Sequence, residues 1–204
     1  MPPLTDKSEL NAYYLADPAH ARAAGVMWPA IVERRIDRLF ETALRPDIEI
    51  RRDLFRPSGA LGNYAVKARL AYLLGWVGDD VYHDLLLVAK IRNRFAHVIE
   101  AKDFTDEKIG AWLRNMNGYR ATRSMAERAR QVAVSNPSPN AEVSASISAD
   151  IAESEISTFR FCMDILIEHL DKCRENMEKN LSSLRDNWLV APPPDPEREK
   201  GGGG

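Results

Sequence analysis

Three polar side chains near the middle of the chain have the chemistry to act on a phosphate group. They are Arg92, Asn93 and His97, in the stretch KIRNRFAH that begins at Lys90. A guanidinium binds phosphate oxygens bidentately, and an imidazole exchanges a proton near neutral pH. By itself the spacing is a weak signal, because about one arginine–histidine pair at such a spacing is expected by chance in this chain.

These residues fall at the end of a helix that the apolar pattern predicts over Asp80–Ala96. In a straight helix Asn93 and His97 share a face, whereas Arg92 lies about 140° away from His97. Arg92 and His97 would therefore converge only if the helix ends before His97, or if they meet across a dimer interface.

The alternative for these residues is structural. Arg92 would then pair with a carboxylate such as Asp84 or Asp80. His97 would interact with the C-terminal end of its helix, where the helix dipole favours a positive charge.

A second candidate site is a basic segment between residues 114 and 130. A single acid, Glu127, accompanies its arginines, which are Arg114, Arg120, Arg123, Arg128 and Arg130. Together with Lys90, Arg92 and Arg94, they predict a face that binds nucleic acid, with RNA as the candidate. The alternative is a solvated helix surface whose charge is balanced by acids of the last helix.

The sequence predicts no metal and no small-molecule cofactor. His20, His83 and His169 have no partners at zinc-ligand spacing. Cys162 and Cys173 would lie roughly 16 Å apart along one helix, too far for a disulfide. The chain also has no GxSxG, P-loop or GxGxxG motif.

The composition predicts one soluble domain over residues 1–190. The chain has 204 residues, of which 45% are apolar, and a net charge of −2. Such a balance excludes a global basic field that would recruit nucleic acid or an anionic membrane. The most apolar window, Leu70–Val77, is far shorter than the roughly 20 residues that cross a bilayer. With no signal-peptide pattern at the N-terminus, we expect a cytoplasmic protein.

Apolar residues at helical spacing predict an all-α bundle of about five or six helices. Helices are expected to end before Pro46, to cover Asn63–Leu74 near the centre, and to begin after Thr105. Asp79 is the expected N-cap of the Asp80–Ala96 helix. Two segments rich in Pro, Ser or Gly should lack regular structure: a mobile loop over 135–150 and a disordered tail over 191–204.

The longest predicted helix is Ile151–Trp188. Its apolar stripe comprises Ile156, Phe159, Met163, Leu166, Leu170, Cys173, Met177, Leu181, Leu184 and Trp188. A helix with such a stripe presents more apolar surface than a small bundle needs, so we expect a homodimer.

Two segments resemble the mannitol operon repressor family. They are PSGALGNYAVKARLAYLLGWVGDDVYHDLLLVAKIRNRFAH, over Pro57–His97, and FTDEKI, which begins at Phe104. The family pattern is a G-x-L-G turn, a basic-apolar helix, a YGLG-like turn, a YHDL-like helix with an R-x-x-x-x-H end, and an FTDDEI-like start. The resemblance implies a helical fold, a dimer, and repression of a sugar-uptake operon through protein or nucleic-acid contacts.

Arg92, Asn93 and His97 also resemble the R-x(4–6)-H motif of HEPN-type ribonucleases, which cut RNA without a metal. This resemblance implies that His97 is the general acid/base, that Arg92 stabilises charge on the phosphate, and that Asn93 orients His97 or the phosphate. The favoured hypothesis is thus a non-catalytic regulator. The alternative is a metal-independent endoribonuclease with a toxin or defence role.

Overall fold

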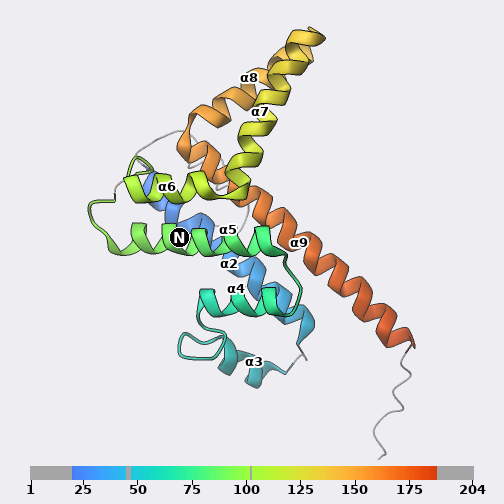
Figure 1. Cartoon of the computed structure of the whole chain (residues 1–204). Coiled ribbons are helices and arrows are strands. Elements are labelled where there is room, and N and C mark those ends of the chain that lie inside the picture. Colours follow the sequence, from blue (N-terminus) through green and yellow to red (C-terminus); the bar gives the residue numbers. More distant parts are fainter. Residues whose placement is uncertain (1–19, 45–46, 102, 188–204) are drawn as a thin grey trace, which may run out of the picture.

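The computed structural model describes residues 20–44, 47–101 and 103–187, and all regular structure in these ranges is helical (Figure 1). The helices are α2 (Ala21–Ala43), α3 (Ile48–Phe55), α4 (Tyr64–Leu73), α5 (Asp79–His97), α6 (Glu107–Asn115), α7 (Asn117–Ser135), α8 (Pro139–Glu153) and α9 (Glu155–Asn187). The all-α class and the long C-terminal helix are confirmed, but the described residues form eight helices instead of five or six. The tail predicted over 191–204 lies outside the described residues.

Helix α2 forms the centre of the body. It packs most extensively against α9, and it also contacts α5 and α4. Its buried stripe consists of Trp28, Val32, Ile36 and Leu39. The prediction that the Asn63–Leu74 helix is central was wrong: Asn63 is the N-cap of α4, and Leu73 and Leu74 are exposed at its other end.

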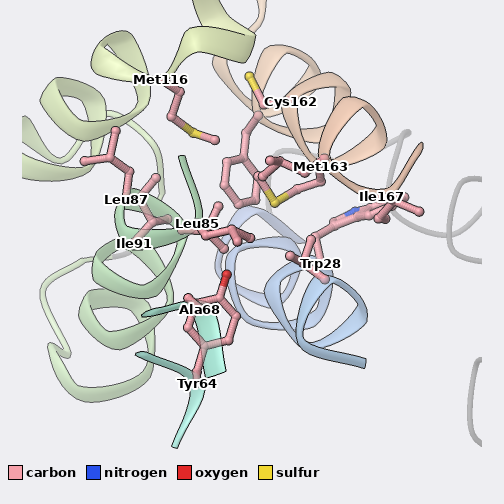
Figure 2. Close-up of a cluster of buried hydrophobic side chains, with 14 of the residues drawn as sticks. Trp28, Tyr64, Ala68, Leu85, Leu87, Ile91, Met116, Cys162, Met163 and Ile167 are labelled. Carbon is pink, nitrogen blue, oxygen red and sulfur yellow. The ribbon is translucent and has the colours of Figure 1, made fainter. Parts of the chain in front are cut away.

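Helix α5 supplies the second wall of the core. Leu85 of α5, Trp28 of α2 and Met163 of α9 point into one apolar cluster (Figure 2). The helix begins directly after Gly78, so the prediction that Asp79 is the N-cap was wrong. The carboxylate of Asp79 accepts the Tyr72 hydroxyl at 2.7 Å instead.

Asp106, and not the predicted Thr105, caps the N-terminus of α6. Its Oδ1 accepts the backbone N–H groups of Lys108 and Ile109, both at 3.1 Å. Thr105 donates its hydroxyl to Asp103. An acid one residue further along therefore satisfies the free N–H groups of the helix.

Helices α7 and α8 form a hairpin that projects from the body (Figure 1). The loop predicted over 135–150 was wrong, because the chain is helical again from Pro139. Ser138 caps α8 by accepting Ala141 N–H at 3.2 Å, and proline is favoured in the first turn of a helix. The helical pattern of α8 was missed because its partly buried positions carry small side chains, among them Ala141, Ala145 and Ser148.

Among the side chains that the structure describes, the apolar stripe of α9 is fully buried only in its first half; Leu184 and Trp188 are not among them. The helix starts at Glu155, four residues later than predicted. Phe159, Met163 and Leu170 are at most 1% exposed, whereas Cys173, Met177 and Leu181 are only half-buried.

Candidate functional site

Arg92 and Asn93 line a cavity of about 270 Å³ between α2, α5 and the N-terminus of α4. The other lining residues are Glu33, Gly62, Asn63, Tyr64, Ala65 and Ala89. The α4 side of the cavity is fixed by the cap, in which Asn63 Oδ1 accepts Ala65 N–H at 2.8 Å. Figure 2 shows the Tyr64 ring extending from α4 into the body, with its hydroxyl at the inner end.

A buried lysine lies beside this cavity and joins α4 to α2. Lys67 Nζ is 2.8 Å from Glu33 Oε1 and 2.6 Å from Asp37 Oδ1, and the residue is only 3% exposed. Burial raises the pKa of Asp37, and the hydrogen bond from Lys67 partly offsets this shift. One cation thus serves two carboxylates on successive turns of α2.

Two buried polar atoms of the cavity-lining residues have no hydrogen-bond partner in the described part of the chain. They are Nε of Arg92 and the hydroxyl oxygen of Tyr64. Burial, together with the negative charge of Glu33, raises the pKa of Tyr64, which therefore stays protonated and able to donate. An unmatched buried donor costs about 1–3 kcal/mol, so both groups favour an added acceptor.

His97 does not join Arg92 and Asn93 at the cavity. Helix α5 continues through His97, so the condition that the helix end before it is not met. His97 is exposed and is not among the lining residues. A single chain therefore places a guanidinium and an amide at the cavity without an imidazole.

The expected pairing of Arg92 with Asp84 or Asp80 was also wrong. Asp84 is 4% exposed, and its two oxygens accept the backbone N–H groups of Asn117 at 2.8 Å and Gly118 at 3.0 Å. Within the described residues neither Asp80 nor Asp84 forms an ion pair with Arg92. The side chain of Arg92 is on the α2 and α4 side of α5, away from α7.

Arg94 is held by a bidentate ion pair. Its Nε and one terminal nitrogen donate to the two oxygens of Asp106, both at 2.6 Å. These hydrogen bonds, assisted by two backbone N–H groups of α6, lower the pKa of Asp106 to about 2. Arg94 therefore joins α5 to α6, while Lys90 on the same helix is exposed.

The arginines of α7 all lie at exposed positions of the helix. These arginines are Arg120, Arg123, Arg128 and Arg130. Arg123 stacks over the Tyr119 ring at 6.0 Å, and Arg114 at the end of α6 is 3.5 Å from Glu155. The hairpin points away from α5 (Figure 1), whereas Lys90, Arg92 and Arg94 lie on α5 itself.

Other chemistry is limited within the described ranges. They hold no group of three or more His, Cys, Asp or Glu residues that could bind a metal. Cys162 and Cys173 are free thiols, and burial, with the charge of Asp84, raises the pKa of Cys162 to about 12. None of the described helices is long and apolar enough to span a membrane.

Sequence reasoning found Arg92 and Asn93 but missed Glu33, Tyr64 and Lys67. One available signal was Lys67 itself. Lys67 and Arg69 are the only charged residues of α4, and the other residues of this helix are uncharged. The second was the pair Glu33 and Asp37, which have the spacing of neighbours on one helix face.

Comparison with known proteins identifies the family. A family model described as mannitol repressor matches residues 26–146, which is more than half of the chain and includes the cavity and all of α7. No curated protein and no solved structure matches, and the resemblance to HEPN-type ribonucleases finds no support among these comparisons. The chain belongs to the mannitol repressor family.

Proposed function

We propose that this protein is a regulator of the repressor type that controls a sugar operon, and that the exposed arginines of α7 contact nucleic acid. The family match supports the regulatory role. The observation that carries the contact surface is the exposure of Arg120, Arg123, Arg128 and Arg130 on the projecting hairpin. Guanidinium groups on an accessible helix bind phosphate oxygens at little desolvation cost.

The geometry at Arg92 also favours a regulator over an enzyme. The ribonuclease hypothesis needs Arg92 and His97 on one phosphate, and His97 lies outside the cavity that Arg92 lines. The function proposed here requires no catalytic group.

The test is repression of a reporter fused to a mannitol operon promoter, in cells that lack their own repressor. A triple variant, Arg120→Ser with Arg123→Ser and Arg128→Ser, removes hairpin charge. The matched control removes equal charge elsewhere, through Arg34→Ser, Arg38→Ser and Arg69→Ser, all exposed. We expect the hairpin variant to lose repression while the control variant represses as the wild type does.

Binding of the promoter DNA and of its transcript leader, measured at several salt concentrations, identifies the partner. Loss of three phosphate contacts reduces the slope of log K against log salt by about 3. Full repression by the hairpin variant would overturn the proposal. So would a loss of repression with neither nucleic acid bound by the wild type, which would point to a protein partner.

A further inference from the structure

The cavity beside Arg92 has the composition of a small-ligand site. We propose that it binds a small neutral polyhydroxylated compound, the chemical class of sugars and sugar alcohols. The role of this cavity as an effector site rests on the proposed regulatory function. Ligand binding to the cavity is measured independently of that function.

The donors of the cavity call for acceptor atoms on the ligand. Arg92 Nε is buried without a hydrogen-bond partner in the described part of the chain, and so is the hydroxyl of Tyr64, which is 7% exposed. Asn93 adds an amide at the exposed side. Ligand hydroxyl oxygens would accept these hydrogens and recover the cost of leaving a buried donor unmatched.

The cavity also presents a hydrogen-bond acceptor, the carboxylate of Glu33. A ligand without hydrogen-bond donors could not use it. Glu33 lines the cavity and meets Lys67 through Oε1. A carboxylate accepts several hydrogen bonds and donates none. A hydroxyl group both donates and accepts, so a compound with several hydroxyls matches Glu33 and Arg92 at once.

Charge balance excludes a strongly anionic ligand. Glu33 and Asp37 carry two negative charges, and Lys67 and Arg92 carry two positive ones. A phosphate placed against Arg92 would add negative charge beside Glu33 in a partly desolvated site, which is unfavourable without a further cation. A neutral ligand keeps the balance.

The size of the cavity limits the ligand to a small molecule. Its volume of about 270 Å³ is just below the usual range of ligand pockets, about 300–1,000 Å³. Small residues keep this space open, since Gly62, Ala65 and Ala89 line it. A Cβ on Gly62 would lie 2.2 Å from the carbonyl oxygen of Arg56, so a larger residue there would displace the turn before α4.

Titration calorimetry of the purified full chain tests the proposal with three probes: mannitol, mannitol 1-phosphate and inorganic phosphate. We expect saturable mannitol binding with a Kd of about 1 mM or lower, and weaker binding of both phosphate probes. Arg92→Gln and Asn93→Ala should each weaken mannitol binding about tenfold. Lys90→Ala, an exposed change on the same helix outside the cavity, should leave it unchanged.

Ala89→Leu provides a second route, because it fills the cavity without removing a charge, and it should abolish the heat of binding. Thermal unfolding verifies that each variant is folded. The proposal is overturned if no probe saturates at about 10 mM, if Arg92→Gln binds mannitol as the wild type does, or if a phosphate probe binds more tightly than mannitol. The hairpin variants lie outside the cavity, so the repression assay succeeds or fails separately.

Discussion

The buried carboxylate of Asp84 in α5 accepts the backbone N–H of Gly118 in α7 at 3.0 Å. Its other oxygen accepts the N–H of Asn117 at 2.8 Å. The first N–H groups of a helix have no acceptor within that helix. Asp84 therefore caps α7 from a different helix and fixes the base of the hairpin on the body.

We expect Asp84→Ala to lower the free energy of unfolding by about 2–3 kcal/mol, because two N–H groups lose their acceptor in a buried site. Asp84→Asn keeps one acceptor oxygen and should lose less stability than Asp84→Ala. Urea denaturation followed by circular dichroism measures both. Asp80→Ala, an exposed position one turn earlier, is the control. An Asp84→Ala protein as stable as this control would contradict the capping role.

The ion pair of Arg94 and Asp106 should make stability depend on acid pH. Because the pKa of Asp106 is lowered to about 2 in the fold from an ordinary 3.8, its contribution is fully present above about pH 4 and is lost as the pH falls towards 2. Asp106→Asn should lower the free energy of unfolding at pH 7 by about 1 kcal/mol. Between pH 4 and 2 this variant should lose less stability than the wild type does. Denaturant midpoints at several pH values measure this, with the exposed Asp53→Asn as the control. If the stability of Asp106→Asn falls between pH 4 and 2 as steeply as that of the wild type, the ion pair does not cause the acid sensitivity.

Two glycines in helices should respond oppositely to alanine. A Cβ on Gly25 of α2 would lie 2.1 Å from the Phe95 ring of α5, whereas a Cβ on Gly110 would meet only the flexible end of Arg114, at 3.0 Å. We expect Gly25→Ala to destabilise by about 1–3 kcal/mol through overpacking. Gly110→Ala should stabilise by about 0.5–1 kcal/mol, because alanine is the better helix former. Melting temperatures decide, and a stabilised Gly25→Ala protein would mean that α2 and α5 are not in close contact there.

Purified protein in EDTA should leave single-stranded RNA intact at neutral pH. His97 and Arg92 do not meet at one cavity in a single chain, so the acid–base and phosphate-binding groups of a metal-independent ribonuclease are not assembled. Gel analysis of a labelled RNA over hours measures this. Cleavage that disappears in both His97→Ala and Arg92→Ala would establish the enzyme instead, with the two residues meeting across a dimer interface.

The homodimer stays a prediction. The half-buried residues Cys173, Met177 and Leu181 of α9 are the surface on which we expect the second chain to pack. Sedimentation equilibrium at micromolar concentration should show twice the 23.0 kDa mass of the chain. Met177→Glu should shift the population towards monomer, because it places a charge in an apolar contact. A single 23.0 kDa species for the wild-type protein would end this idea.

The helices that the sequence predicted well are those with wide apolar stripes. The stripe of α2 and the Leu85 face of α5 were visible because large side chains recur at helical spacing. Helix α8 was not predicted, because a helix that packs through alanine and serine shows no stripe of large apolar side chains. Its remaining signals were Ser138 and Pro139, a cap followed by a favoured first residue.

The candidate site was only half predictable for a different reason. Arg92 and Asn93 were named from a local motif, but their neighbours come from α2 and α4, distant in sequence. The pairing of Glu33 with Lys67 depends on how three helices pack. Asp84 likewise serves α7 and not Arg92, because packing places it against backbone N–H groups more than 30 residues away.

The outer part of the hairpin carries none of the body's core. Beyond Ala126 no residue of α7 is fully buried, and the turn at its tip joins it directly to α8. Seven residues added to each arm would keep the same helix faces together and would move the tip outward by about 10 Å. Insertions or deletions of seven residues in both arms, about two turns each, should therefore change how far the hairpin extends while leaving the core contacts of the body in place.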